Sequence, residues 1–209
     1  MNNISNDVIN VGCPRRFILL PSNNLSLTNG KKAGNITKKN IIVTSGPTNE
    51  RIDAVMKITN MSTGALGVKI ADELLKEDDL GKLYYLSPKL AYKPKTKSEK
   101  LELVQIESAL DLLKALKDII TNNEIYGVVH SAAVGDYYGE YAITGEMLAS
   151  LIARNIYNKV LSIEELENTI LEVIKNPDVI TDNTHKISSY QDNLMVKLGL
   201  TPKVIKSIK

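Results

Sequence analysis

The chain has 209 residues, which is the size of one domain or of a domain with a smaller second part. Its composition, 43% hydrophobic and 24% charged, fits a folded globular protein and argues against a disordered or collagen-like chain. The formal net charge of +2 gives no field of the strength that nucleic-acid or membrane-surface binding would need. We therefore expect neither nucleic acid nor a membrane as a partner.

The chain offers no sign of secretion or of a metal centre. Its one cysteine, Cys13, has no partner for an intramolecular disulfide, and no Cys/His cluster indicates a metal site. Residues 14–21 place two arginines before an apolar run, but the run is shorter than the roughly seven apolar residues of a signal peptide. No stretch approaches the roughly 20 apolar residues of a membrane span. We expect a cytoplasmic protein.

Strands and helices alternate through the first part of the chain. Residues 1–39 are rich in Asn, Ser, Gly and Lys, and we interpret them as a loose N-terminal extension with one short strand over 17–20. Further strands are expected over residues 41–44, 82–86, 101–106 and, as a near-continuous apolar run, 125–134. Helices are expected from residues 62–64 onward and over 109–120, the second with Leu110, Leu113, Leu116 and Ile120 on its apolar face.

The second part of the chain predicts two helices and a pair of strands. The helices span 146–157 and 162–175, and the second opens with the capping box Ser162-x-x-Glu165. Residues 186–189 and 193–198 are interpreted as the strand pair, and Thr201 followed by Pro202 as the start of a last helix. Because the chain stops within the first turns of that helix, we expect the sheet to be incomplete.

This alternation predicts the fold class. It indicates right-handed βαβ units and therefore an α/β fold, a Rossmann-like three-layer sandwich with a mainly parallel sheet, a helical insertion and a small strand pair. We expect residues 40–209 to form one nucleotide-binding domain, incomplete at its C-terminus.

Ligands of an open parallel sheet bind beyond the carboxyl ends of its strands, where three segments should meet. The first is Ser45-Gly46-Pro47-Thr48, which follows the strand at 41–44. Gly46 permits a close backbone approach and the Thr48 hydroxyl can bond a phosphate oxygen. An ordinary tight turn explains the tetrapeptide at least as well.

The second segment opens a helix. Ser62, Thr63, Gly64 and Gly67 place hydroxyls and glycines where a helix presents unpaired N–H groups and the positive end of its dipole, which suits an anion. A serine cap with glycines for close packing of the helix on the sheet is the competing explanation.

The third segment, residues 131–137, follows the strand at 125–134. Ala132 and Ala133 would let a ligand lie against the backbone, and Asp136 could accept hydrogen bonds from a ribose. Ordinary tight packing with a capping aspartate is the alternative. His130, on a buried strand, is interpreted as a core histidine rather than a base or ligand.

Hydride transfer is not the favoured activity. The G-x-G-x-x-G pattern directly after the first strand is missing. Tyr85 and Lys89 have the spacing of a reductase pair, but Pro88 and a strand-like context spoil the helical geometry which that pair needs. Neither a phosphate-binding P-loop nor a Ser-His-Asp elbow is present.

Taken together, the segments resemble a family. Residues 41–48 with Ile52-Asp53, then residues 58–67, 130–137 and 186–189, occur in the order found in phosphopantothenate–cysteine ligase, also known as phosphopantothenoylcysteine synthetase. The likeness runs from about residue 40 to 209. The chain looks most like the free-standing form, because no flavin decarboxylase domain precedes the motifs.

The resemblance implies a two-step ligation in coenzyme A biosynthesis. The carboxylate of 4′-phosphopantothenate attacks the α-phosphate of CTP or ATP, giving an acyl-nucleotide and pyrophosphate, and the amine of cysteine then displaces the nucleoside monophosphate. Mg²⁺ would accompany the nucleotide. A homodimer is expected from the family.

The resemblance also assigns roles to residues. Lys186 falls where the family carries a lysine used in forming the acyl-nucleotide, and Asn60 where an asparagine positions the acyl intermediate. Gly46 and Thr48 with residues 62–67 would hold phosphates. The nucleoside would be lined by Ala132, Ala133 and Asp136.

Some features depart from the family. Met56 stands where an arginine is usual, with Lys57 beside it, and residues 141–186 contain a longer helical insertion than most members. A later strand and an Ala-Asn-Asp loop that helps bind the nucleotide and build the dimer are expected to be missing. The alternative hypothesis is therefore a non-catalytic nucleotide-binding or interaction module descended from the enzyme.

Overall fold

The computed structural model describes residues 38–207. Cys13, the strand expected over 17–20 and the last two residues lie outside this range. The chain divides into two compact units, which we name the sheet unit (up to Asn49, Thr59–Asp136 and from Thr201) and the ribbon unit (Glu50–Ile58 and Tyr137–Leu200). The expected division into an extension over 1–39 and one domain over 40–209 stays a prediction.

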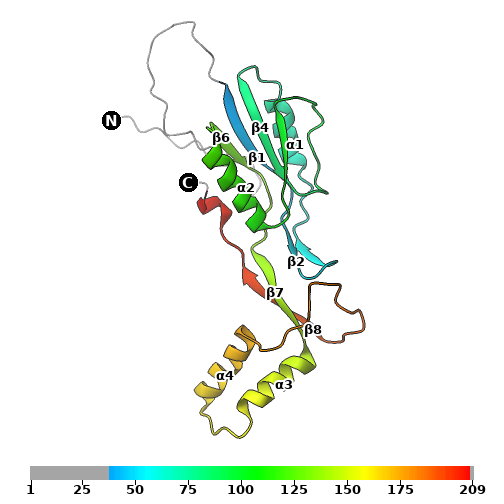
Figure 1. The fold of residues 1–209 in the computed structure, drawn as a ribbon, viewed down its shortest axis with the longest axis vertical. Coiled ribbons are helices and arrows are strands. Elements are labelled where there is room, and N and C mark those ends of the chain that lie inside the picture. Colours follow the sequence, from blue (N-terminus) through cyan, green and yellow to red (C-terminus); the bar gives the residue numbers. More distant parts are fainter. Residues whose placement is uncertain (1–37, 208–209) are drawn as a thin grey trace, which may run out of the picture. The chain divides into compact units, whose positions relative to one another are not determined.

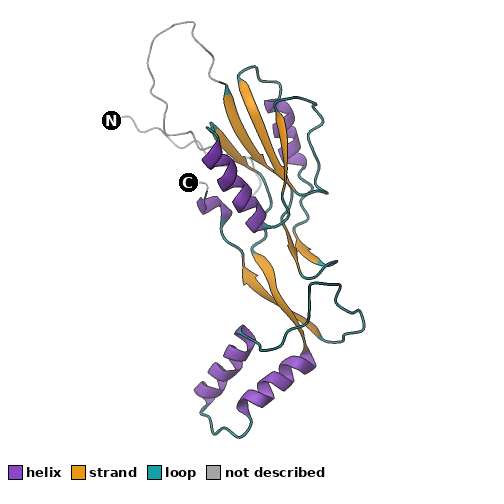
Figure 2. Cartoon of the chain, in the orientation of Figure 1, coloured by secondary structure: helices purple, strands orange, loops and turns teal. Residues whose placement is uncertain are grey.

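A four-stranded parallel sheet forms the centre of the sheet unit. Its strands occur in the order β5-β4-β1-β6 (Figure 1). Their bounds are Lys39–Thr44 for β1, Leu80–Ser87 for β4, Leu101–Gln105 for β5 and Gly127–His130 for β6. The helices of this unit are α1 (Ala65–Leu74) and α2 (Ala109–Asn122), shown beside the strands in Figure 2.

The two faces of this sheet have separate cores. Side chains alternate along a strand, so Ile42 packs with Leu112 of α2 on one face, whereas its neighbour Val43 packs with Ala71 of α1 on the other. All four side chains are fully buried. One helix therefore covers each face, and the expected Rossmann-like α/β class is confirmed.

The apolar face expected for α2 was only partly right. Leu116 is buried and Leu113 half-buried, but Leu110 and Ile120 are exposed. The helix begins at Ala109, after the N-cap Ser108. With 3.6 residues per turn, the face against the sheet follows Ala109, Leu112 and Leu116, and not the expected set that includes Leu110 and Ile120. The buried residues of α2 are Ala109, Leu112 and Leu116.

The strand expected over 125–134 is shorter than predicted. It ends at His130, which pairs with Thr44, the last residue of β1. Two residues beyond Thr44, Gly46 has a φ of 78°, which no extended strand adopts, so the regular ladder is interrupted there. Residues 131–136 are consequently a loop, joined to the turn after β1 by an isolated bridge between Pro47 and Ala133.

The ribbon unit consists of an antiparallel pair of strands and a helical hairpin (Figure 1). β7 (Tyr137–Thr144) pairs with β8 (Leu194–Leu200), and between them lie α3 (Gly145–Ile156) and α4 (Ile163–Lys175). Both helices match their predicted ranges to within a residue or two. The capping box of Ser162 and Glu165 is confirmed, since each side chain bonds the other residue's backbone N–H.

The predicted strand pair was wrong in one partner. Residues 186–189 form a loop, and β8 pairs instead with β7, which the sequence analysis missed. The signal for β7 was present, because Tyr137, Tyr138, Tyr141 and the β-branched residues after them favour a strand. A short hairpin of β2 (Asn49–Arg51) and β3 (Lys57–Thr59) was missed as well.

The last helix also differs from expectation. Thr201 and Pro202 precede only a 3₁₀ helix, η1 (Val204–Ser207). The Thr201 hydroxyl donates to the Gly135 carbonyl and its N–H donates to the Asp136 carbonyl, so this residue ties the segment to the loop after β6 instead of capping a helix. Between residues 38 and 207, none of the helices combines the length and the apolar character that crossing a membrane requires.

Candidate functional site

The chain order of the parallel strands identifies one place in the sheet unit where a ligand is expected. β1 leads through α1 to β4 on one side, whereas β5 leads through α2 to β6 on the other side of β1. The crevice between such strands, at their carboxyl ends, is the usual ligand site of an open α/β sheet. We call this place the switch edge; it is formed by residues 45–48 after β1 and 131–136 after β6.

Backbone hydrogen bonds join the two loops of the switch edge. The Ala133 N–H donates to the Gly46 carbonyl at 2.8 Å, and the Thr48 N–H donates to the Ala133 carbonyl at 3.0 Å. The Asn60 side chain donates to that same carbonyl at 3.0 Å. Gly46, Thr48 and Ala133, which were predicted from segments at strand ends, therefore meet at one point with Asn60, which was predicted from the family resemblance.

Asn60 keeps hydrogen-bonding capacity beyond this contact. Its side chain is exposed, and only one of its two amide hydrogens is needed for the bond to Ala133. Its Oδ1 makes no hydrogen bond to any residue between 38 and 207. The amide is thus held in place and still presents a donor and an acceptor.

Thr48 and Ala132 have structural partners. The Thr48 side chain is 1% exposed, and its hydroxyl accepts a hydrogen bond of 2.9 Å from the Gly135 N–H. The Ala132 N–H donates to the Thr44 hydroxyl at 3.2 Å. These contacts fix the loop after β6; a role of Thr48 on phosphate or of Ala132 on a nucleoside stays a prediction.

The start of α1 is built on glycine rather than on a serine cap. The N-cap is Gly64, with a φ of 82° that favours glycine, and it makes no side-chain cap. Ser62 lies two residues earlier, and the Thr63 hydroxyl accepts only a long bond of 3.4 Å from the Ala65 N–H. The serine cap, which was the competing explanation for this segment, is therefore wrong, because a left-handed residue is needed where the chain turns into the helix.

Gly67 marks the closest approach of α1 to the sheet. A Cβ atom there would lie 2.5 Å from the Ser45 Cβ and 2.9 Å from the Ser131 Oγ, so a side chain has no room against the ends of β1 and β6. Close packing of α1 on the sheet is therefore enough to explain why this position is glycine.

Gly67→Ala is therefore expected to destabilise the protein. Backbone-anchored atoms of Ser45 must shift, and overpacking of this kind costs about 2–3 kcal/mol, which outweighs the roughly 1 kcal/mol gained in helix propensity. Urea denaturation followed by circular dichroism measures the change. Gly139→Ala is the matched control, since a Cβ there meets ordinary contacts of 3.4 Å and longer. Equal midpoints for the two variants would contradict the packing role.

Asp136 has a charged partner that the sequence did not indicate. Its carboxylate lies 2.6 Å from the Lys203 ammonium, and both side chains are mostly exposed. Such an exposed pair contributes at most about 1 kcal/mol, so a ligand can compete for either group. Lys203 thereby adds a cation to the switch edge.

Two further polar groups lie at the carboxyl ends of the strands. A 2.8 Å bond joins His130 Nδ1 to the Thr44 hydroxyl, and burial lowers the pKa of His130, as befits the predicted core histidine. The Lys93 ammonium donates to the Ser87 hydroxyl at 2.7 Å and to the Pro88 carbonyl at 2.6 Å, and burial lowers its pKa. Lys93 was not predicted from the sequence, because only the folded loop after β4 brings it to the strand end.

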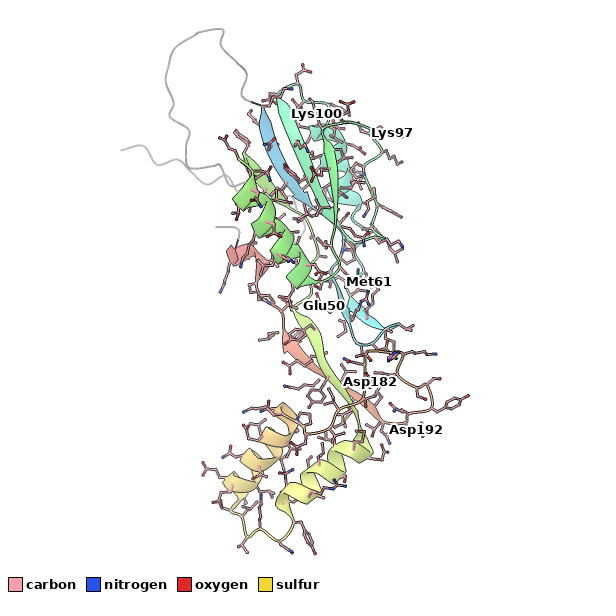
Figure 3. The ribbon with its side chains drawn as sticks, viewed as in Figure 1. Glu50, Met61, Lys97, Lys100, Asp182 and Asp192 are labelled. Atoms are coloured by element: carbon pink, nitrogen blue, oxygen red, sulfur yellow. The ribbon has the colours of Figure 1, made fainter. Side chains whose placement is uncertain are left out.

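Lys186 belongs to the ribbon unit. It is an exposed residue of the loop that runs between Asp182 and Asp192, both labelled in Figure 3. Its neighbour Ile187 is buried. Met56 and Lys57, at the position where the family usually has arginine, are both exposed in the same unit.

With this geometry in place, the chain can be compared with known proteins. Residues 36–196 match the family model of the DNA/pantothenate metabolism flavoprotein C-terminal domain, abbreviated DFP. The chain belongs to the DFP family. The resemblance drawn from the sequence is confirmed by this match.

Two coenzyme A biosynthesis bifunctional proteins (CoaBC) are among its relatives. The protein from Borreliella burgdorferi is 25% identical over 152 residues, which cover 72% of this chain and 33% of that protein. The protein from Bacillus subtilis is 33% identical over 101 residues, or 47% of this chain and 23% of that protein. This DFP chain thus spans a third or less of those relatives.

Solved structures have the same fold. The DNA/pantothenate metabolism flavoprotein of Streptococcus pneumoniae matches with a TM-score of 0.56 and 28% identity, covering 81% of this chain and 63% of that chain. A Cab2 mutant in complex with phosphopantothenate-cysteine matches with a TM-score of 0.50 and 17% identity, covering 82% of this chain and 59% of that chain. At that identity the second match shows the fold alone.

Proposed function

We propose that this DFP-family chain takes part in coenzyme A biosynthesis by ligating cysteine to 4′-phosphopantothenate, with CTP or ATP as the energy source. The observation that carries the proposal is the hydrogen bond of 3.0 Å by which Asn60 meets Ala133 at the switch edge. It joins two of the motifs on which the family resemblance rests. The relatives named for coenzyme A biosynthesis support the same pathway.

In the first step, a carboxylate oxygen of 4′-phosphopantothenate bonds to the α-phosphorus of the nucleotide, and the bond to the β-phosphate breaks to release pyrophosphate. Both reactants are anions, so a cation between them offsets their repulsion and stabilises the charge that develops on the α-phosphate. We assign this task to the Lys186 ammonium, which solvent exposure leaves open to a ligand.

In the second step, the amine of cysteine attacks the activated carbonyl, loses a proton to solvent, and expels CMP or AMP. Asn60 would hold the acyl-nucleotide, because one side-chain amide can bond a carbonyl and a phosphate oxygen together. Gly46, Thr48 and residues 62–67 would lie along the phosphates, and Ala132, Ala133 and Asp136 along the nucleoside.

Mg²⁺ would arrive with the nucleotide and neutralise part of the triphosphate charge. Between residues 38 and 207 there is no group of three or more His, Cys, Asp or Glu side chains that could hold a metal by itself. In nucleotide sites, phosphate oxygens and water supply most of the ligands of Mg²⁺, and the protein adds one or two carboxylates. Asp136 is a carboxylate at the switch edge that could serve.

Mass spectrometry of the products tests the proposal. The full chain is incubated with 4′-phosphopantothenate, cysteine, Mg²⁺ and either CTP or ATP, with the Bacillus subtilis relative run in parallel as the positive control. We expect phosphopantothenoylcysteine, together with CMP or AMP that names the nucleotide. The double variant Asn60→Ala/Lys186→Ala, purified in the same way, controls for contaminating host enzyme. Nucleotide binding without product would instead make the chain a non-catalytic nucleotide-binding module.

A further inference from the structure

Asp53 is a buried carboxylate in the ribbon unit that no step above uses. It lies in the turn between β2 and β3, and its side chain is only 3% exposed. Buried carboxylates are rare unless hydrogen bonds or charges compensate their lost hydration. The groups that donate hydrogen bonds to the Asp53 carboxylate therefore indicate its role.

One carboxylate oxygen closes the turn in which Asp53 itself lies. Oδ1 accepts from the Val55 N–H at 2.7 Å and from the Met56 N–H at 2.5 Å. The Met56 carbonyl in turn accepts from the Ile52 N–H at 2.9 Å. This half of the carboxylate has a local, structural task.

The other oxygen reaches a segment far away in the sequence. Oδ2 accepts from the Ile187 N–H at 2.9 Å, across 134 positions. The Ile187 side chain is itself only 4% exposed. The loop is therefore fixed at Ile187 from two sides, by a buried side chain and by a charge-assisted hydrogen bond, while the preceding residue, Lys186, remains exposed.

Electrostatics agree with this geometry. The N–H groups of Met56 and Ile187 hold the pKa of Asp53 below its usual value, and the positive charge of Lys186 lowers that pKa further. The carboxylate is thus ionised at neutral pH and attracts the lysine beside the residue that it binds.

We propose that Asp53 is a positioning residue for Lys186: by binding the Ile187 N–H it holds the lysine where the first step of the ligation needs it. This inference rests on the proposed function. It assigns to Asp53 no contact with substrate. Its effect is on the placement of a neighbouring ammonium, where a displacement of about 1 Å can cost about 100-fold in rate.

Asp53→Asn separates the two tasks of the carboxylate. An amide has one acceptor oxygen, so it can close the turn at Val55 and Met56 but then presents its NH₂ group to the Ile187 N–H. Asp111→Asn is the matched control. Asp111 is also a carboxylate that binds backbone N–H groups, those of Ser108 at 2.9 Å and Glu107 at 3.2 Å, but it does so in the sheet unit.

The experiment measures pyrophosphate release in a single turnover at saturating substrates, with the full chain. We expect Asp53→Asn to slow it about 10- to 100-fold with little change in KM, and Asp111→Asn to leave it unchanged. The double variant Asp53→Asn/Lys186→Ala should be no slower than Lys186→Ala alone, because a positioning residue has nothing left to position. Additive losses would overturn the inference.

Hydrogen exchange at the Ile187 amide, measured by NMR, is the second readout. Exchange should become faster in Asp53→Asn and remain unchanged in Asp111→Asn.

If Asp53→Asn does not fold, Ile187→Pro is the substitute variant. Proline has no N–H, so this variant lacks the same hydrogen bond and should also slow the first step. If Asp53→Asn or Ile187→Pro folds and releases pyrophosphate at the full rate, the inference about Asp53 is overturned, and the proposed function is not. An unmodified chain that makes no product beside an active relative would instead overturn the proposed function on which the inference rests.

Discussion

Replacing Lys186 with alanine is expected to slow the release of pyrophosphate by about 100- to 1,000-fold. The substitution removes the one positive charge that the proposed first step assigns between two anions, and the exposed position of Lys186 means that no buried contact is lost with it. Quench-flow measurement of pyrophosphate with 4′-phosphopantothenate and nucleotide, in the absence of cysteine, isolates this step.

Lys97→Ala is the matched control for that experiment. Lys97 is an exposed lysine in the loop after β4, labelled in Figure 3, and no role is assigned to it. It should release pyrophosphate at the normal rate. Lys186→Arg keeps the charge and should recover part of the lost rate. A normal rate in Lys186→Ala would show that the charge for the first step comes from elsewhere, with Lys93 and Lys203 as the next candidates.

Asn60→Ala is expected to leave pyrophosphate release within a few-fold of normal and to slow the second step about 100-fold. The acyl-nucleotide should therefore accumulate, and mass spectrometry of the quenched reaction should detect it bound to the protein. The fold should survive, because the Ala133 carbonyl keeps its hydrogen bond of 3.0 Å from the Thr48 N–H when the Asn60 amide is removed.

Asn122→Ala controls for the loss of an amide as such. The Asn122 side chain also donates to a backbone carbonyl, that of Asp118 at 2.8 Å, but it does so near the end of α2. It should turn over normally. If Asn60→Ala instead blocked pyrophosphate release as Lys186→Ala does, the two residues would act in the same step and the division of labour would be wrong.

Much of the sheet unit could be predicted from local sequence patterns. The β-branched run before Ser45 and the strands at 82–86 and 101–106 are found close to their expected bounds. The pairing of β7 with β8 in the ribbon unit could not be predicted in this way, because the two strands lie far apart in the sequence. β8 was expected beside residues 186–189, but its partner is β7, on the far side of two helices, and no local pattern names a partner at that distance.

The same distinction applies to the candidate site. Gly46 and Ala133 could be named from local signatures of glycine and small residues in loops at strand ends, and Asn60 from the resemblance to the family. The pairing of Asp136 with Lys203 and the bond from Ile187 to Asp53 could not, because each joins segments whose proximity exists only in the folded chain. Gly64 as the N-cap of α1 depends on a backbone angle that the Ser-Thr-Gly sequence leaves open.

The pairing of β7 with β8 has a consequence for the order of folding. The strands begin to pair at Thr144 and Leu194, so everything from Gly145 to Asn193 must be spanned before the first rung forms. Closing a flexible loop costs more entropy as the loop lengthens, by about 0.6 kcal/mol for each doubling. α3 and α4 are local and capped at Thr144 and Ser162, and their Leu151 and Val173 pack in one small core with Tyr141 and Ile143 of β7. Once these helices dock on each other, the flexible part of the span shrinks to the loop that carries Lys186 and the short connections, and the ribbon can close late and at lower entropic cost.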